Sequence, residues 1–107
     1  MSDTIKAVIQ RPGELSEIVR IGNDIKALNR RVGGVSTEVT IPENGLKLIM
    51  HISSRNGTPN LKTLWGKIFG TVLIVAKKER QAVSMTPEQI QSARAWLLRH
   101  KYEEADQ

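Results

Sequence analysis

A nearly continuous apolar run, residues 68–75, constrains the fold more than any other feature of the sequence. It reads Ile-Phe-Gly-Thr-Val-Leu-Ile-Val, with apolar side chains at both odd and even positions. A strand of this kind is covered on both faces. We therefore expect residues 68–75 to be the central strand of a sheet with other elements packed on each side. Gly70 inside the run is typical of a place where a neighbouring backbone or side chain approaches closely.

The remaining composition indicates one ordinary folded domain. The chain has 107 residues, 39% of them hydrophobic and 25% charged, and it has no cysteine. This length is that of a single domain, residues 1–107. Without cysteine there are no disulfides and no thiolate metal sites, which suits a reducing compartment. The longest apolar stretch, residues 72–76, is too short to cross a bilayer, and the first residues carry no signal-like pattern. We expect a cytoplasmic protein without membrane association.

Two hairpins are predicted before the central strand. Alternating apolar and polar residues indicate strands over residues 5–9 and 15–21, with a turn at Pro12-Gly13 between them. Residues 37–41 and 46–52 show the second such pair, around the turn Pro42-Glu43-Asn44-Gly45. The polar stretch 53–60 reads as an exposed loop, and residues 61–65 as one helical turn before the central strand.

Two helices are predicted. The first is about ten residues long, can be capped by Asn23, and ends at Gly33-Gly34, with Arg30 and Arg31 favoured in its last turn by the helix dipole. Its apolar face holds Ile25, Leu28 and Val32. The second covers residues 87–101, with Thr86 as N-cap and Gln89 completing a capping box. Its apolar stripe is Ile90, Ala93 and Leu97, widened by Trp96 and Leu98.

These elements follow one another in the order β-β-α-β-β-β-α, and residues 103–107 read as a frayed tail. The expected fold class is α+β, a mixed but mainly antiparallel sheet packed with two helices.

Positive charge is concentrated in the middle of the chain. The formal net charge is +5. Residues 1–46 balance six basic with six acidic side chains, residues 47–83 hold seven basic and one acidic, and residues 84–107 hold three basic and four acidic. From residue 47 to residue 78 there is no acidic residue at all. Such asymmetry favours an anionic partner, although it also fits a solvated surface that keeps a small protein soluble.

The candidate ligand-binding residues lie in and after this basic segment. Arginine and lysine side chains with loop amides can hold a phosphate, and a tryptophan among them can stack on a base. The alternative for Trp65 is that it covers the core. The candidates are Arg55, Asn56, Asn60, Lys62, Trp65, Lys67, Lys77 and Lys78.

Catalytic chemistry has little support in the sequence. The only histidines, His51 and His100, do not have metal-ligand spacing. No nucleophile elbow, phosphate-binding glycine loop or pair of convergent carboxylates is recognisable. We expect a protein that binds rather than an enzyme, without metal or cofactor.

Over nearly its whole length the chain resembles a small bacterial, phage and mobile-element family labelled domain of unknown function 3846. The pattern that carries the resemblance is Ile5-Lys6-Ala7-Val8 leading to Pro12-Gly13, residues 21–28, Val32-Gly33-Gly34 with Glu38, Gly57-Thr58-Pro59-Asn60, residues 68–75 and residues 84–90. The chain departs from the family after the fourth strand, where His51-Ile52-Ser53-Ser54-Arg55 replaces an acidic stretch. The resemblance implies an accessory protein that counters a host defence system, and it implies no catalytic residues.

Two mechanisms for such a protein remain open. In the first, the basic segment captures an anionic nucleotide or nucleic acid. In the second, a sheet edge or helix face blocks a host defence protein. The chain could also associate with copies of itself, as small binding proteins often do.

Overall fold

The computed structural model describes residues 4–53 and 57–103. Within them, eight strands and two helices follow one another in the order β1 (Thr4–Gln10), β2 (Glu17–Gly22), α1 (Ile25–Val32), β3 (Ser36–Thr40), β4 (Lys47–His51), β5 (Pro59–Thr63), β6 (Gly66–Phe69), β7 (Val72–Lys78), β8 (Gln81–Val83) and α2 (Pro87–His100).

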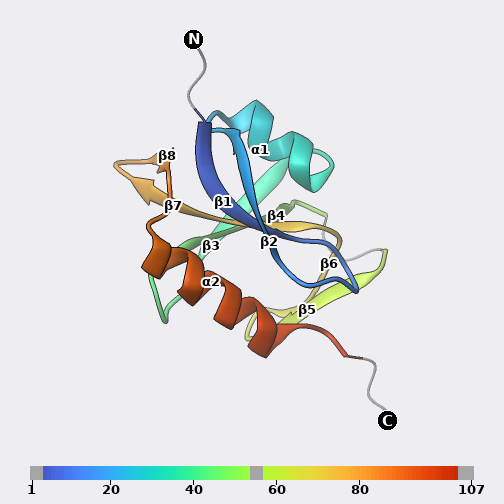
Figure 1. Cartoon of the computed structure of the whole chain (residues 1–107). Coiled ribbons are helices and arrows are strands. Elements are labelled where there is room, and N and C mark those ends of the chain that lie inside the picture. The colour runs from blue at the N-terminus through green and yellow to red at the C-terminus, as the bar shows by residue number, and fades with distance from the viewer. Residues whose placement is uncertain (1–3, 54–56, 104–107) are drawn as a thin grey trace.

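An antiparallel sheet forms the centre of the molecule (Figure 1). Its strand order is β2-β1-β7-β4-β3, and β8 pairs with the far end of β7. A separate two-stranded sheet contains β5 and β6. The α+β class is confirmed, with every pairing between named strands antiparallel.

Both faces of β7 are buried, as the apolar run predicts. Its side chains alternate between two clusters: Val72, Ile74 and Ala76 join the cluster that contains Trp96 and Leu97 of α2. Leu73 and Val75 join the cluster that contains Leu28 and Val32 of α1. The two helices therefore cover opposite faces of the sheet (Figure 1).

The expectation of one central strand over residues 68–75 is wrong in its boundaries. Gly70 has a φ of 83° and separates β6 from β7, so that the two strands belong to different sheets. The expected close approach at Gly70 is also wrong, because a Cβ placed there would meet no heavy atom within 4 Å. Glycine is required here by its backbone conformation, which side-chain-bearing residues adopt at a cost.

Two further strands were not predicted. Residues 61–65 do not form a helical turn: Pro59–Thr63 is β5, which pairs with β6 and buries Leu61. The loop after β4 is accordingly shorter than expected, because Pro59 already belongs to this strand. The second missed strand, β8, follows a tight turn at Glu79 and Arg80, which both have positive φ. Glycine or asparagine usually marks such a turn, and neither is present.

The two helices form close to where their local signals place them, although α2 ends at His100 rather than at residue 101. Three residues differ from the predictions, and one of them is Ile25, which was expected on the apolar face of α1 and is 60% exposed. Asp24 caps α1 in place of Asn23, its Oδ1 accepting from Ala27 N at 2.8 Å. Gly33 ends α1 in the left-handed conformation as predicted, and the capping box between Thr86 and Gln89 is present. Leu98 does not widen the buried stripe of α2, because 65% of it is exposed. It follows Leu97 and therefore points about 100° away from it.

We predict that the conformation at Gly70 determines which substitutions it tolerates. Gly70→Ala should lower the free energy of unfolding by about 1 kcal/mol, because an L-residue is strained at this φ. Gly70→Asn should cost less and Gly70→Val more, since asparagine tolerates the left-handed region and a β-branched residue does not. Urea unfolding of the three variants measures the order. A valine variant as stable as the wild type would contradict the left-handed conformation at Gly70.

Candidate functional site

The structure places six of the eight predicted ligand-binding residues, and these six lie at three separate places. Lys62, Trp65 and Lys67 lie together on the hairpin formed by β5 and β6. Lys77 and Lys78 lie at the end of β7, and Asn60 is buried. Arg55 and Asn56 lie outside the described residues. The basic segment is therefore not one continuous surface in the described part of the fold.

Lys62 and Lys67 are direct cross-strand partners on the exposed side of the hairpin. Leu61 and Ile68, their neighbours in the two strands, are buried on the other side. The chain after α2 runs beside the hairpin, where Lys101 forms an isolated β-bridge with Leu61 and shares the inner face with it. Tyr102 follows, and Lys67 Nζ lies 5.3 Å from the centroid of its ring. We call the set Lys62, Lys67 and Tyr102 the hairpin surface.

The hairpin surface carries positive charge that no described carboxylate neutralises. The ion pairs found within residues 4–53 and 57–103 join Arg11 to Glu17 and Lys77 to Glu38, and neither involves these lysines. Cross-strand partners have Cβ atoms about 5 Å apart, and like charges in that position destabilise a hairpin. An anion placed between Lys62 and Lys67 would remove this repulsion.

Trp65 covers the core at the tip of the hairpin. Its ring centroid lies 6.4 Å from that of Trp96, and 37% of the residue is exposed. Trp96 is buried and its ring also lies against His100, at 4.5 Å between centroids. This geometry supports the packing interpretation of Trp65, because one face of the indole is turned towards another side chain.

Asn60 is buried and connects distant segments of the fold, although the sequence predicts it as an exposed ligand-binding residue. Its Nδ2 donates to the backbone oxygens of Gln10 and Gly70, both at 2.8 Å. Its Oδ1 accepts from Gln10 Nε2 at 3.0 Å, and its backbone oxygen accepts from Tyr102 N at 2.8 Å. These bonds use both Nδ2 hydrogens, and burial of the side chain keeps it out of reach of a ligand.

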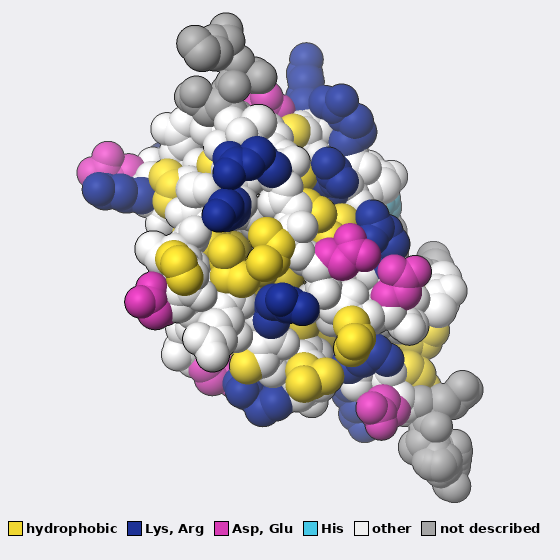
Figure 2. Space-filling model, viewed as in Figure 1, with side chains coloured by type: hydrophobic (Ala, Val, Ile, Leu, Met, Phe, Trp, Pro, Cys, Tyr) yellow, Lys and Arg dark blue, Asp and Glu magenta, His cyan; other side chains and the backbone are white. Residues whose placement is uncertain are grey.

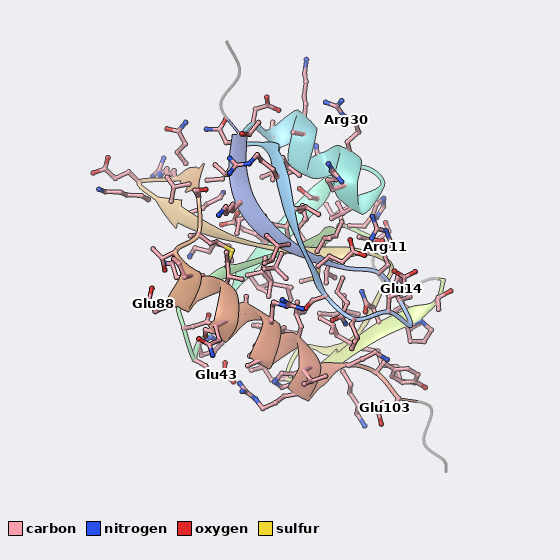
Figure 3. The ribbon with its side chains drawn as sticks, viewed as in Figure 1. Arg11, Glu14, Arg30, Glu43, Glu88 and Glu103 are labelled. Carbon is pink, nitrogen blue, oxygen red and sulfur yellow. The ribbon has the colours of Figure 1, made fainter. Side chains whose placement is uncertain are left out.

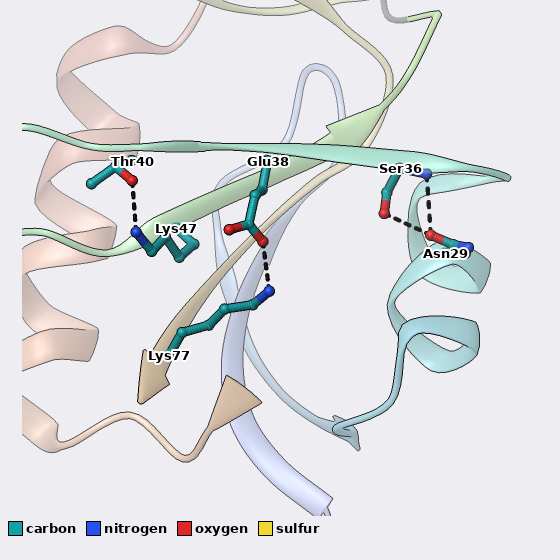
Figure 4. A network of polar contacts seen from close by, with 6 residues as sticks. All are labelled: Asn29, Ser36, Glu38, Thr40, Lys47 and Lys77. Carbon is teal, nitrogen blue, oxygen red and sulfur yellow. Dashed lines mark hydrogen bonds and ion pairs between the residues drawn. The ribbon is translucent and has the colours of Figure 1, made fainter. Parts of the chain in front are cut away.

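Lys77 and Lys78 are distant from the hairpin surface. They end a strand of seven residues whose other end, Val72, follows the hairpin, which places them roughly 20 Å from Val72. Lys77 is also neutralised, since its Nζ lies 2.7 Å from Glu38 Oε1 (Figure 4). These two lysines do not join Lys62 and Lys67 in one site.

A groove lined by arginines was missed by the sequence reasoning. Arg20 of β2 and Arg30 and Arg31 of α1 line a space of about 520 Å³ with Asp24. The two ion pairs of the described residues involve none of these arginines. The sequence analysis explained Arg30 and Arg31 by their position in the last turn of α1, where the helix dipole favours cations. Only the tertiary packing of α1 against β2 brings Arg20 beside them.

The described residues form no convergent catalytic centre. Figure 3 shows Glu14, Glu88 and Glu103 at separate places on the outside of the molecule. His51 Nδ1 accepts from Ser53 N, and His100 Nδ1 lies 3.2 Å from Lys62 O. Among the residues that the structure describes, no three histidine or carboxylate side chains are grouped as metal ligands. In the same residues, neither helix is long and apolar enough to cross a membrane.

Comparison of the chain with protein-family models, with curated proteins and with solved structures finds no match. The resemblance described above therefore stays an expectation, and function has to be argued from the site.

We predict that Asn60 contributes to stability rather than to ligand binding. Asn60→Ala should lower the free energy of unfolding by about 3 kcal/mol, because it removes the partner of the buried Gln10 amide and one hydrogen bond to each of two backbone oxygens. Lys62→Ala, two residues along the same strand, should change it by less than about 0.5 kcal/mol. Thermal and urea unfolding compare the two variants. Equal stability of Asn60→Ala and the wild type would contradict this role.

Proposed function

We propose that the chain is a binding protein that holds an anionic ligand, a nucleotide or a nucleic acid, on the hairpin surface. The observation that carries the proposal is the pair Lys62 and Lys67, placed directly opposite each other on an exposed hairpin and paired with no carboxylate of the described residues. A hairpin selected for stability alone would place an acidic or neutral residue at one of these positions. A phosphate between the two ammonium groups gains two charge-assisted hydrogen bonds.

The surroundings of the pair support the same ligand class. The ring of Tyr102 offers an aromatic face next to Lys67. Aromatic rings beside basic side chains bind single-stranded nucleic acid by stacking and charge together. Glu103 is the nearest acidic residue along the chain, and it forms no ion pair with these lysines. The arginine groove is a second positive region to which a phosphate can bind.

We propose the biological setting on the resemblance alone: a phage or mobile-element protein that counters a host defence system by binding. Mass spectrometry of molecules that co-purify with the chain from defence-active cells tests it. Recovery of a nucleotide or nucleic acid supports the anionic ligand, and recovery of a defence protein alone supports the steric inhibitor instead.

We predict that the lysine pair controls affinity for anions. Wild-type chain should bind a fluorescein-labelled oligothymidylate in anisotropy titrations, with affinity that falls as salt rises. The double variant Lys62→Gln, Lys67→Gln should bind at least about tenfold more weakly. Its slope of log affinity against log salt should be smaller by about 1.4, the value for two lost phosphate contacts on a single strand. ATP as competitor shows whether a nucleotide suffices.

The matched control is Lys26→Gln, Lys78→Gln, which removes the same charge from exposed residues outside the hairpin surface. Its affinity should change far less than that of the hairpin variant. The hairpin variant should also be no less stable than the wild type, because it relieves a like-charge contact. Equal losses in both variants would show a merely general charge effect. A loss only in Arg20→Gln, Arg31→Gln would move the site to the arginine groove.

A further inference from the structure

An apolar groove separate from the hairpin surface runs between α2 and the connection from β1 to β2. It has a volume of about 530 Å³. Gln10, Leu15 and Ser16 line one side, and residues of α2, among them Ile90, Arg94 and Leu98, line the other. Figure 2, which views the molecule from the side of α2 and β2, shows hydrophobic side chains gathered here around a basic one. We call this space the α2 groove.

Large hydrophobic residues remain exposed around the α2 groove. Leu15 is 66% exposed and Leu98 is 65% exposed, and both line it. Ile18 of β2 is 48% exposed. Its cross-strand partner Val8 belongs to the α2-side cluster, so Ile18 points to the same face of the sheet as the groove. A soluble monomer seldom exposes several large apolar side chains together unless a partner covers them.

Ser16, which lines the α2 groove, directly precedes an open sheet edge. In the strand order of the described residues, β2 pairs with β1 and lies at one edge, and β3 lies at the other. The two edges differ, since β3 reads Ser-Thr-Glu-Val-Thr and presents mainly polar side chains. The other edge, β2, contains three β-branched apolar residues, Ile18, Val19 and Ile21. An open edge with apolar side chains pairs readily with an added strand.

The positive charges on the face of Ile18 indicate which side chains an added strand would carry. Lys6 and Arg20 are cross-strand partners, and both share the face of Ile18. Arg94 lies in the groove, where its Nε donates to Ser16 Oγ at 3.2 Å. No ion pair of the described residues involves any of these three cations. A strand laid along β2 would meet an apolar side chain at Ile18 and a cation at Arg20.

We propose that β2 and the α2 groove bind an extended segment of a partner protein whose α2-facing side chains, at every second residue, alternate between apolar groups and carboxylates. The segment adds to the sheet as a strand next to β2. One apolar side chain enters the α2 groove between Leu15 and Leu98, and carboxylates pair with Arg20 and Arg94. Main-chain hydrogen bonds supply affinity, while the groove and the two arginines supply specificity.

The probe is a synthetic peptide of about ten residues in which every second position is in turn leucine and aspartate, with threonine at the positions between them, so that both kinds of side chain face α2. A matched peptide carries lysine in place of aspartate. Titration of ¹⁵N-labelled chain should shift the amide signals of β2 and of the α2 groove, and should leave those of β3 in place. The lysine peptide should bind at least about tenfold more weakly, because it opposes Arg20 and Arg94.

Substitutions test which residues form the peptide-binding surface. Arg94→Gln should weaken binding about tenfold, and Ile18→Lys should abolish it by placing a charge on the strand edge. Thr37→Lys is the matched control, because it places the same charge on the other edge strand, and it should bind as the wild type does. Circular dichroism confirms that each variant is folded.

Three outcomes would overturn the proposal. These are the absence of shifts at β2 with peptide at about 1 mM, equal binding of the two peptides, and equal shifts at β3. A dimer in sedimentation experiments that Ile18→Lys dissociates would also overturn it, since a second copy would then cover this edge. The oligothymidylate titration is independent of all four outcomes, so either proposal can fail alone.

Discussion

The buried amide pair Gln10 and Asn60 joins the parts of the fold that the strands alone leave separate. The β5–β6 hairpin shares no strand pairing with the six-stranded sheet. Asn60 connects them, because its side chain bonds to Gln10 at the end of β1 and to Gly70 between β6 and β7. Each such bond stabilises the fold by about 1 kcal/mol net, whereas a buried group left unpaired costs more. The hairpin is therefore fixed in one position.

This fixed position explains how a like-charge pair is tolerated on the hairpin. Leu61 and Ile68 on its inner side are buried in the α2-side cluster. Burial of two such side chains stabilises the fold by roughly 3 to 6 kcal/mol, whereas an unfavourable cross-strand pair costs at most about 1 kcal/mol. The repulsion between Lys62 and Lys67 therefore does not displace the hairpin. It stays available to be relieved by an anion.

The sequence predicted those helices and strands whose position is set by nearby residues. Alternation identified the two hairpins, and glycine at Gly33 and the capping box at Thr86 marked helix ends. The same signals failed at β5 and β8. Asn60 has the residue type of a loop, and only its partners from distant segments show that it is buried. The turn at Glu79 and Arg80 uses positive φ without glycine or asparagine. The arginine and α2 grooves come from tertiary packing, which a local pattern does not report.

Gln10 connects the two surfaces that the proposals concern. Its side chain lines the α2 groove, and its amide donates to Asn60, whose strand carries Lys62. A substitution at Gln10 or Asn60 would therefore disturb both surfaces together and could not distinguish their roles. Lys67 and Arg94 are exposed and form no ion pair within the described residues. Because surface charges of this kind contribute little to stability, changes at these two residues separate anion binding from strand addition without altering the fold that supports both.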